Sequence, residues 1–215
     1  MQTLALVSIT LCLAVNVWAQ KPRHCRSPPL VVGSLTVSAR EGEFFAEAKY
    51  SYDALLKRVR LREFGCNSSQ AFHTDKLILF RKRVMYDISY HNHSCKRVPL
   101  RVHFHPMEVP REAQLLSEVV LGSSSAPGQG LLVNIWVGNV SETGGKYFST
   151  FTEFGCLPVS SIYYSNSTGW VITSFFNNMY GIGNPEDFIP PDFCMQKENE
   201  ETEWGTERDF FEALF

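Results

Sequence analysis

The 215-residue chain lacks the short motifs that identify the common enzyme classes. It contains no G-x-S-x-G elbow, no phosphate-binding P-loop and no H-E-x-x-H zinc motif. Gly181-Ile182-Gly183 has neither the third glycine nor the following helix of a dinucleotide-binding turn, and no segment matches an EF-hand calcium loop. The sequence therefore predicts that the protein is not an enzyme and assigns no catalytic residue.

An excess of one charge is also lacking, because 20 Lys and Arg stand against 22 Asp and Glu, a formal net charge of −2. This balance argues against general nucleic-acid binding. The distribution is nevertheless uneven: residues 21–111 carry 17 basic and 8 acidic residues, whereas residues 112–215 carry 3 and 14. The two halves should attract each other, within one fold or between subunits.

Long hydrophobic runs are confined to the N-terminus. The uncharged run from Leu4 to Val17 is short for a bilayer span, and no later segment approaches the roughly 20 apolar residues of a transmembrane helix. Small residues at Val17 and Ala19 suit cleavage after Ala19. We predict a secreted protein without a membrane span; an N-terminal anchor is the alternative. The expected parts are a signal peptide over 1–19, a β domain over 20–195 and an acidic, solvated tail over 196–215.

Cysteine is sparse and never forms a C-x-x-C pair, which disfavours zinc-ribbon and thioredoxin-like sites. Removal of the signal peptide takes Cys12 and leaves five: Cys25, Cys66, Cys95, Cys156 and Cys194. In an oxidising compartment these predict long-range disulfides, and their odd number leaves at least one thiol free or paired between chains. The sequence alone does not choose among the pairings.

Metal and thiol chemistry have weak candidates. His91 with His93, and His103 with His105, could each share a strand face, but no third ligand accompanies either pair. Catalysis by Cys66 with a histidine is disfavoured, because an oxidising exterior does not maintain a thiolate. We interpret the histidines as exposed polar positions, and the metal ligands stay unknown.

Four N-x-S/T sequons are present, at Asn67, Asn92, Asn139 and Asn166. Three of them lie in polar stretches between apolar runs, where a bulky glycan needs to be. Together with the signal peptide they predict a glycoprotein.

Alternating apolar and polar residues predict strands rather than helices. Strand candidates are 45–53, 57–64, 77–80, 84–90, 100–105, 131–137, 147–154, 159–164 and 170–176. Residues 53–56 and 81–83 are expected turns, and 123–130 a flexible loop; the best helix candidate is Pro110 to Val119. About nine short strands suggest antiparallel sheets in a sandwich or open barrel.

Aromatic residues crowd residues 147–180. Most are expected to fill a core, but a curved sheet can instead leave a cavity for a lipid-like ligand. The pocket candidates are Trp136, Phe151, Tyr163, Trp170 and Phe175.

Several segments carry a family resemblance. They are Tyr52-Asp53 with Arg58-Val59-Arg60; Val84 to Ile88 leading to Cys95-Lys96; Cys156 to Val159; and Phe175-Phe176, Gly181-Ile182, Pro185, Phe188 to Pro191 and Cys194. From about Cys25 to Cys194 the chain resembles the ependymin family of secreted glycoproteins.

The resemblance implies two stacked, curved antiparallel sheets of the bacterial lipoprotein-carrier type, a half-barrel with a hydrophobic pocket and one or two short helices. It implies a secreted homodimer, with lysosomal members in the family, linked to calcium binding, cell–matrix adhesion and nervous tissue. Calcium would be held weakly, through glycans or acidic surface. The alternative function is a carrier of lipid or another amphiphile in extracellular fluid or the lysosome, with adhesion secondary.

The resemblance also implies the disulfides Cys25–Cys156 and Cys95–Cys194. In related proteins the position of Cys66 pairs near the C-terminus, but this chain has no cysteine after Cys194. Cys66 is therefore expected to be free or to form an intermolecular disulfide. Asn92 and Asn67 match family glycan sites, whereas Asn139 and Asn166 do not belong to that pattern.

Overall fold

The computed structural model describes residues 22–39, 44–67, 70–140, 145–165 and 169–194. The predicted signal peptide, the acidic tail and Asn166 lie outside the described residues. Within them the strands are β1 (Leu30–Ala39), β2 (Phe44–Asp53), β3 (Arg58–Asn67), β4 (Gln70–Leu79), β5 (Val84–Ser89), β6 (Ser94–Pro99), β7 (Gln114–Gly122), β8 (Gly130–Val140), β9 (Gly145–Thr152), β10 (Pro158–Ser165) and β11 (Gly169–Tyr180). Short 3-10 turns are η2 (Phe80–Lys82), η3 (Pro185–Phe188) and η4 (Asp192–Cys194).

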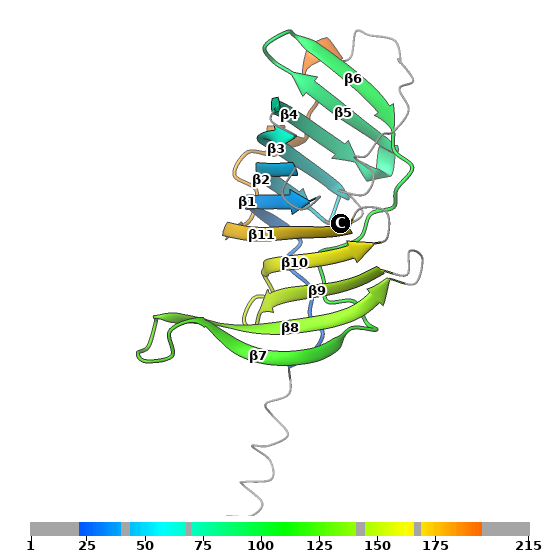
Figure 1. Ribbon diagram of the computed structural model, residues 1–215. Coiled ribbons are helices and arrows are strands. Elements are labelled where there is room, and N and C mark those ends of the chain that lie inside the picture. The colour runs from blue at the N-terminus through cyan, green and yellow to red at the C-terminus, as the bar shows by residue number, and fades with distance from the viewer. Residues whose placement is uncertain (1–21, 40–43, 68–69, 141–144, 166–168, 195–215) are drawn as a thin grey trace, which may run out of the picture.

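All eleven strands form one antiparallel sheet in the order β6-β5-β4-β3-β2-β1-β11-β10-β9-β8-β7. The sheet is curved, and β6 and β7 lie at its opposite ends (Figure 1). The predicted mainly β, half-barrel architecture is confirmed. The two stacked sheets implied by the resemblance are one continuous sheet, because β1 and β11 pair from Val31 with Tyr180 to Ala39 with Val171.

The expected turns are confirmed and have local causes. Asp53 Oδ1 accepts a hydrogen bond of 2.9 Å from Leu56 N, which closes the turn between β2 and β3. In the next turn Arg83 adopts φ 51°, and its N–H bonds the carbonyl of Phe80. The loop at 123–130 joins β7 to β8.

The helix predicted from Pro110 to Val119 is wrong. Ala113 N bonds Pro110 O at 3.0 Å, which makes a single turn, and β7 begins at Gln114. Burial along β7 then alternates every second residue, and the strand pairs with β8. Pairing at the sheet edge overrides a weak local helix pattern.

The strand predicted at Leu100 to His105 is also wrong, although its alternation is right. Leu100 is buried and Phe104 half-buried, whereas His103 and His105 are exposed. The segment crosses the sheet instead of pairing with it: Phe104 stacks on Tyr52 with ring centroids 5.9 Å apart. Burial of one side of an extended chain produces the same sequence period as a strand.

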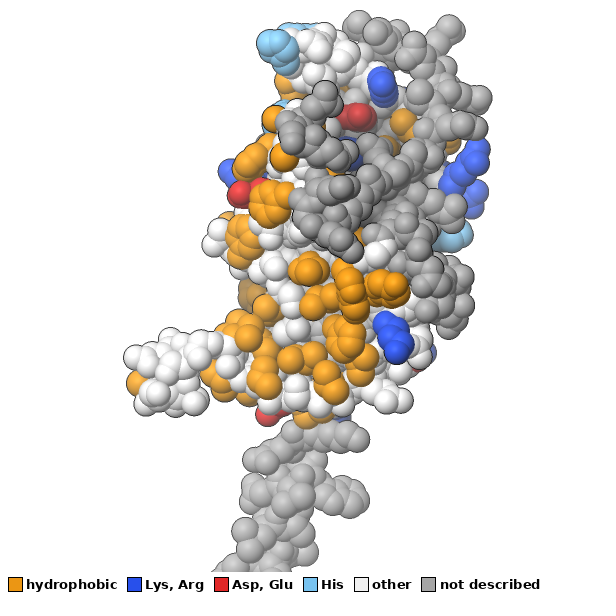
Figure 2. Space-filling view, viewed as in Figure 1, with side chains coloured by type: hydrophobic (Ala, Val, Ile, Leu, Met, Phe, Trp, Pro, Cys, Tyr) orange, Lys and Arg blue, Asp and Glu red, His pale blue; other side chains and the backbone are white. Residues whose placement is uncertain are grey.

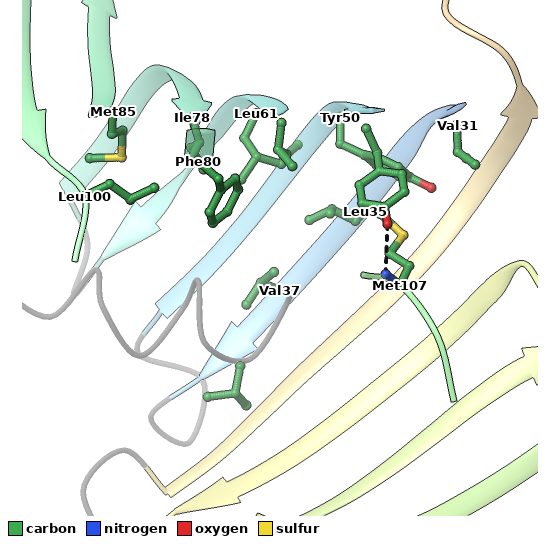
Figure 3. Close-up of a cluster of buried hydrophobic side chains, with 14 of the residues drawn as sticks. Val31, Leu35, Val37, Tyr50, Leu61, Ile78, Phe80, Met85, Leu100 and Met107 are labelled. Atoms are coloured by element: carbon green, nitrogen blue, oxygen red, sulfur yellow. Dashed lines mark hydrogen bonds between the residues drawn. The ribbon is translucent and has the colours of Figure 1, made fainter. Parts of the chain in front are cut away.

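The main core lies on one face of the sheet, here called the inner face. Registered pairs place Val31 opposite Tyr52, and Tyr52 opposite Val59. Figure 3 shows the cluster to which they belong, with Leu100 and Met107 over it. These five side chains are each at most 6% exposed. The opposite side of the sheet is called the outer face.

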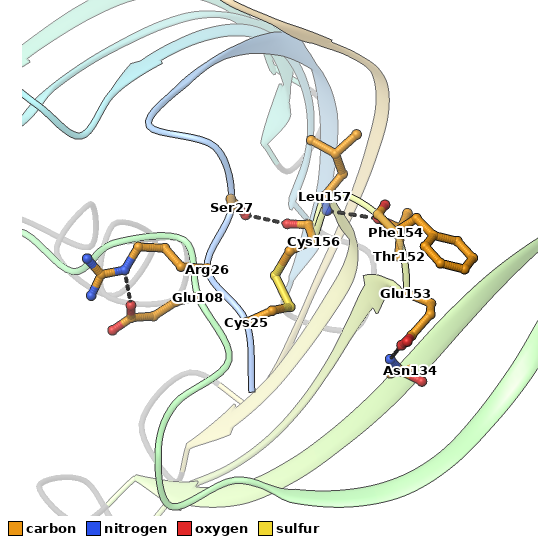
Figure 4. Close-up of a disulfide and its surroundings, with 10 residues drawn as sticks. All are labelled: Cys25, Arg26, Ser27, Glu108, Asn134, Thr152, Glu153, Phe154, Cys156 and Leu157. Atoms are coloured by element: carbon orange, nitrogen blue, oxygen red, sulfur yellow. Dashed lines mark hydrogen bonds and ion pairs between the residues drawn. A yellow bond between two sulfur atoms is a disulfide. The ribbon is translucent and has the colours of Figure 1, made fainter. Parts of the chain in front are cut away.

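Two chain segments, residues 22–29 and 100–113, form the inner cover. Ser27 N bonds Met107 O and Val109 N bonds Cys25 O, both at 2.9 Å, so the segments run side by side. They lie inside the curve of the sheet (Figure 4). The connection from β6 to β7 must join opposite edges, which explains why it crosses this face.

The outer face of β4 to β6 is covered by residues 182–194, the outer cover. Phe188 is 3% exposed and packs with Leu77 and Tyr86. Asp187 Oδ1 accepts a hydrogen bond of 2.8 Å from Arg62 Nη2. This contact joins the basic and acidic halves within one chain.

The structure contains the disulfides Cys25–Cys156 and Cys95–Cys194, the pairs that the resemblance implied. The first holds the inner cover to the loop between β9 and β10, and the second holds the outer cover to β6. Cys66 is a free, exposed thiol near the end of β3. Each cover is therefore fixed covalently to the sheet.

Candidate ligand-binding site on the inner face

Four of the five pocket candidates lie on the inner face at the β8–β11 end: Trp136, Phe151, Tyr163 and Phe175. Trp136 and Phe151 are 2% and 6% exposed. Tyr163 and Phe175 are only partly buried. The antiparallel register places all four on the face that carries Leu35, which pairs with Phe175. Aromatic groups from four strands thus meet on one surface.

The fifth candidate, Trp170, lies on the outer face. Its neighbour Val171 is 4% exposed and packs in the inner core, so alternation turns Trp170 the other way. Trp170 is 49% exposed and contacts the Tyr164 ring at 4.8 Å between centroids. It cannot line one pocket with the other four.

Phe175 is positioned by a bulge in β11. The β1–β11 register shifts between Val32 and Ser34, and Asn177 adopts φ 54°. Beyond the bulge Asn178 Oδ1 accepts a hydrogen bond of 2.7 Å from the Tyr50 hydroxyl, and the Tyr50 ring packs edge-on against Phe175. Burial raises the pKa of Tyr50, so it remains a neutral donor.

The close approach of Tyr50 and Asn178 requires a glycine between them. A Cβ at Gly33 would lie 2.8 Å from Tyr50 Cε1 and 2.6 Å from Asn178 Oδ1. Gly33 therefore lets the bulge dock against β1.

Sequence reasoning missed a row of polar side chains among these aromatic residues. Trp136 pairs with Ser149, Ser149 with Ser161, and Ser161 with Thr173. Ser149 and Thr173 are 8% and 1% exposed, whereas Ser161 is partly exposed. We call these three the hydroxyl row. Its signal was present in the sequence as small polar residues at inward positions of alternating strands, between aromatic ones.

The inner cover lies against the β8 end of this row. The His24 ring lies 4.7 Å from the Trp136 ring, and His24 Nε2 is 2.8 Å from Ala113 O. Ser27 Oγ donates a hydrogen bond of 2.7 Å to Cys156 O (Figure 4). Beside them, burial and then the nearby Glu112 carboxylate raise the pKa of Tyr147 to about 12.

The other predicted sites are spread over the surface. Asn92 is exposed in the turn between β5 and β6, and Asn139 is exposed near the end of β8. Asn67 ends β3. Among the described residues no group of three His, Cys, Asp or Glu side chains could hold a metal ion, so the metal ligands stay unassigned.

A second notable surface is a band across the outer face, here called the outer band. Its members are neighbours across the paired strands. Cys66 is opposite Phe45, and Ser38 lies between Phe45 and Ile172. Ile162 lies between Ile172 and Phe148. Phe45 is 50% and Ile172 is 44% exposed. Figure 2 shows hydrophobic side chains gathered over β8 to β11. A solvated sheet face normally carries polar residues, so this band has the composition of a contact surface.

The fold is a curved, open antiparallel half-barrel, and comparison with known proteins agrees with the earlier resemblance. The ependymin family model matches residues 68–194. Ependymin-2 of Oncorhynchus mykiss is 40% identical over 214 residues, 96% of this chain and 95% of that protein. Ependymin-2 of Carassius auratus is 35% identical, over 90% of this chain and 91% of that protein. The chain belongs to the ependymin family.

Among solved structures, an uncharacterized conserved protein from Thermus thermophilus aligns with a TM-score of 0.49 at 12% identity. The alignment covers 76% of this chain and 88% of that one. Separately, the helices within the described residues include none with the length and apolar character to cross a membrane.

Proposed function

We propose that this chain is a secreted glycoprotein whose inner face binds a lipid-like ligand. The observation that carries the proposal is the meeting of Trp136, Phe151, Tyr163 and Phe175 on that face, with Tyr163 and Phe175 still partly exposed. Covering such surface with an acyl chain is favourable by about 25 cal/mol per Å² of apolar area. Membership of the ependymin family, the N-terminal apolar run and the exposed Asn92 and Asn139 support secretion and glycosylation.

Native mass spectrometry of protein secreted from a eukaryotic host tests the proposal. We expect co-purifying lipid, and loss of most of it in Phe175→Ala. Phe176→Ala is the matched control, because Phe176 is the next residue of β11 and its side chain lies on the outer face. Equal lipid content in both variants, or no lipid in any of them, would contradict binding on the inner face.

Calcium-dependent adhesion to the extracellular matrix is a second activity that we propose for the same protein. It is supported by the acidic half, where residues 112–215 carry 14 acidic and 3 basic residues. Weak calcium binding would come from this surface or from glycans. Calcium titration before and after enzymatic deglycosylation, and after truncation at Gln196, separates the two sources. Unchanged binding in both cases would exclude the glycans and the tail together.

We propose a second copy of this chain as the partner of the outer band. A band of half-exposed apolar side chains is suited to isologous packing against itself. The unpaired Cys66 at one end of the band is placed to reinforce such a contact covalently.

A further inference from the structure

Four buried polar atoms at the β8 end of the hydroxyl row have no hydrogen-bond partner among the described residues. One is the Tyr147 hydroxyl, which lies near the Glu112 carboxylate. The other three concern the head group of a ligand. They are Trp136 Nε1, Ser149 Oγ and Asn134 Oδ1. The three residues are 2%, 8% and 2% exposed. A buried polar atom without a partner is unfavourable, and native proteins keep few of them without a purpose.

The register makes the three residues neighbours on one face. Ser149 is directly opposite Trp136 across β8 and β9, and Asn134 is two residues from Trp136 on the same face of β8. The row continues through Ser161, which is partly exposed, to Thr173. Aromatic side chains flank this polar line, because Phe151 is opposite Asn134 and Tyr163 is opposite Tyr147.

The hydrogen-bonding capacity of the three atoms is mixed. An indole N–H only donates, an amide oxygen only accepts, and a serine hydroxyl does both. The Asn134 amide is oriented by Glu153, whose carboxylate accepts from Nδ2, so its oxygen points elsewhere (Figure 4). A ligand group that satisfies all three atoms must both accept and donate hydrogen bonds.

The nearby charges disfavour an anionic ligand. Glu153 lies beside Asn134, and Glu112 lies near Tyr147 on the same side of the row. A carboxylate or phosphate placed here would be close to like charges, without a cation to pair with it among these residues. The Glu153 carboxylate already accepts a hydrogen bond from Asn134, so the subsite also disfavours a ligand with a charged amine.

We propose that Trp136, Ser149 and Asn134 form a polar subsite for the uncharged head group of an amphiphile that carries a carbonyl and a hydroxyl or amide, such as a monoacylglycerol. The acyl chain lies along Phe151, Tyr163 and Phe175. This assignment rests on the proposed lipid-binding function and specifies the head group that the inner face selects.

Access to the subsite is controlled by the inner cover. The His24 side chain lies on the Trp136 ring but is itself exposed, and its ring nitrogen bonds the carbonyl of Ala113. Val109 and Ala113 of the inner cover belong to the same buried cluster as Trp136, so a ligand reaches Trp136 only when this part of the cover moves. The partly exposed Ser161 and Tyr163 leave the middle of the row open toward the same face.

The test uses delipidated full-length protein and three probes with the same chain: 1-monooleoylglycerol, oleate and oleylamine. Titration followed by native mass spectrometry should rank monooleoylglycerol first. Trp136→Phe removes the N–H and Ser149→Ala the hydroxyl, and each should weaken monooleoylglycerol binding about fivefold, the value of one hydrogen bond, while oleate binding is unchanged. Trp170→Phe and Ser174→Ala make the same chemical changes on the outer face and should have no effect.

A readout without ligand separates recognition from folding. Ser149→Ala removes a hydroxyl that has no partner, so the melting temperature of the ligand-free protein should stay the same or rise. A fall in melting temperature together with equal loss of all three probes would show a structural role and overturn the subsite. Preference for oleate or oleylamine, or full monooleoylglycerol binding by both inner-face variants, would overturn the subsite but leave lipid binding intact. Failure of the wild type to bind any probe would overturn both proposals.

Discussion

Arg60 and Asp75 are joined by two parallel hydrogen bonds across β3 and β4, Nε to Oδ1 and Nη2 to Oδ2, each 2.8 Å long. Both side chains are 4% exposed. Arg60 also donates to the Tyr90 hydroxyl and to the carbonyl of Asp187 in the outer cover. Burial would lower the pKa of Arg60, but hydrogen bonds to Asp75 outweigh burial and raise it, so the guanidinium stays charged. One arginine thus links the sheet to its cover.

Asp75→Ala should destabilise the protein by about 3–5 kcal/mol, because removal of one partner leaves the other as an unpaired buried charge. The midpoint and slope of urea denaturation measure the change. Arg26→Ala is the matched control, since Arg26 pairs with Glu108 at the surface, where its side chain is 66% exposed. The Arg26 variant should denature like the wild type. Equal destabilisation by both changes would contradict the assigned burial.

Asp187 should make stability depend on pH. Burial tends to raise the pKa of Asp187, but hydrogen bonds from Arg62 and Ser51 outweigh burial and hold it below the ordinary 3.8. A depressed carboxyl pKa gives stability that is present above pH 3.8 and is lost as the pH falls below it. Thermal melts between pH 6 and pH 3 should therefore show a steeper loss for the wild type than for Asp187→Asn. Asp192→Asn, at an exposed position of the same cover, should follow the wild type; coincident curves for all three would argue against the Asp187 contacts.

Cys25→Ser combined with Cys156→Ser should lower the free energy of unfolding by about 2–5 kcal/mol, because the bond closes a long loop of the unfolded chain. The partners are 131 residues apart. Hydrogen exchange should increase most at residues 22–29 and 106–109, which the disulfide holds to the sheet. Cys66→Ser removes a thiol that forms no disulfide within this chain, so in the monomer it should leave the denaturation midpoint unchanged. Protection of the inner cover that survives in the double variant would show that packing alone holds it.

Ile172→Glu should convert a dimer to a monomer, because a carboxylate at the middle of the outer band must be desolvated on association. Sedimentation velocity measures the mass, with Ser174→Glu on the same strand as a control.

Non-reducing electrophoresis tests where the two-fold axis of the dimer lies. A two-fold axis near Cys66 gives a covalent dimer that Cys66→Ser abolishes, whereas an axis near Ile172 places the two thiols far apart. A wild type that is monomeric at micromolar concentration would exclude the proposed dimer.

The sequence predicts strand positions only in part. β1 and β6 were not predicted, although Val31, Leu35 and Val37 of β1 are buried, and a helix was predicted over the start of β7. The alternation of Ala46, Ala48, Tyr50 and Tyr52 predicts β2 nearly to its ends. The first part of β4, from Gln70 to Lys76, was not predicted as a strand, because its inward positions include Thr74 and Lys76. Glu63 Oε2 lies 3.1 Å from Thr74 Oγ1 and 3.6 Å from Lys76 Nζ. A set of polar side chains that contact one another inside a sheet looks like a loop in the sequence.

The candidate site was predicted in part for a similar reason. Aromatic composition located Trp136, Phe151, Tyr163 and Phe175, but it could not show that Trp170 lies on the opposite face. The inward direction depends on register with distant strands, such as that of Val171 with Ala39. The hydroxyl row depends on the same long-range register, since Ser149, Ser161 and Thr173 come from three strands and become neighbours only when these pair.

The order of the strands has a consequence for how the protein is made. Among the described strands each consecutive pair lies side by side except β6 and β7, while the first and last strands meet at the centre. The sheet therefore consists of two up-and-down meanders, β1 to β6 and β7 to β11, which are joined where β1 pairs with β11. During synthesis β1 emerges first but must wait for β11, almost the last element to appear, before its free edge is paired. Such non-local pairing slows folding and leaves an edge open to other chains, so the newly made protein depends on protection until the chain is nearly complete.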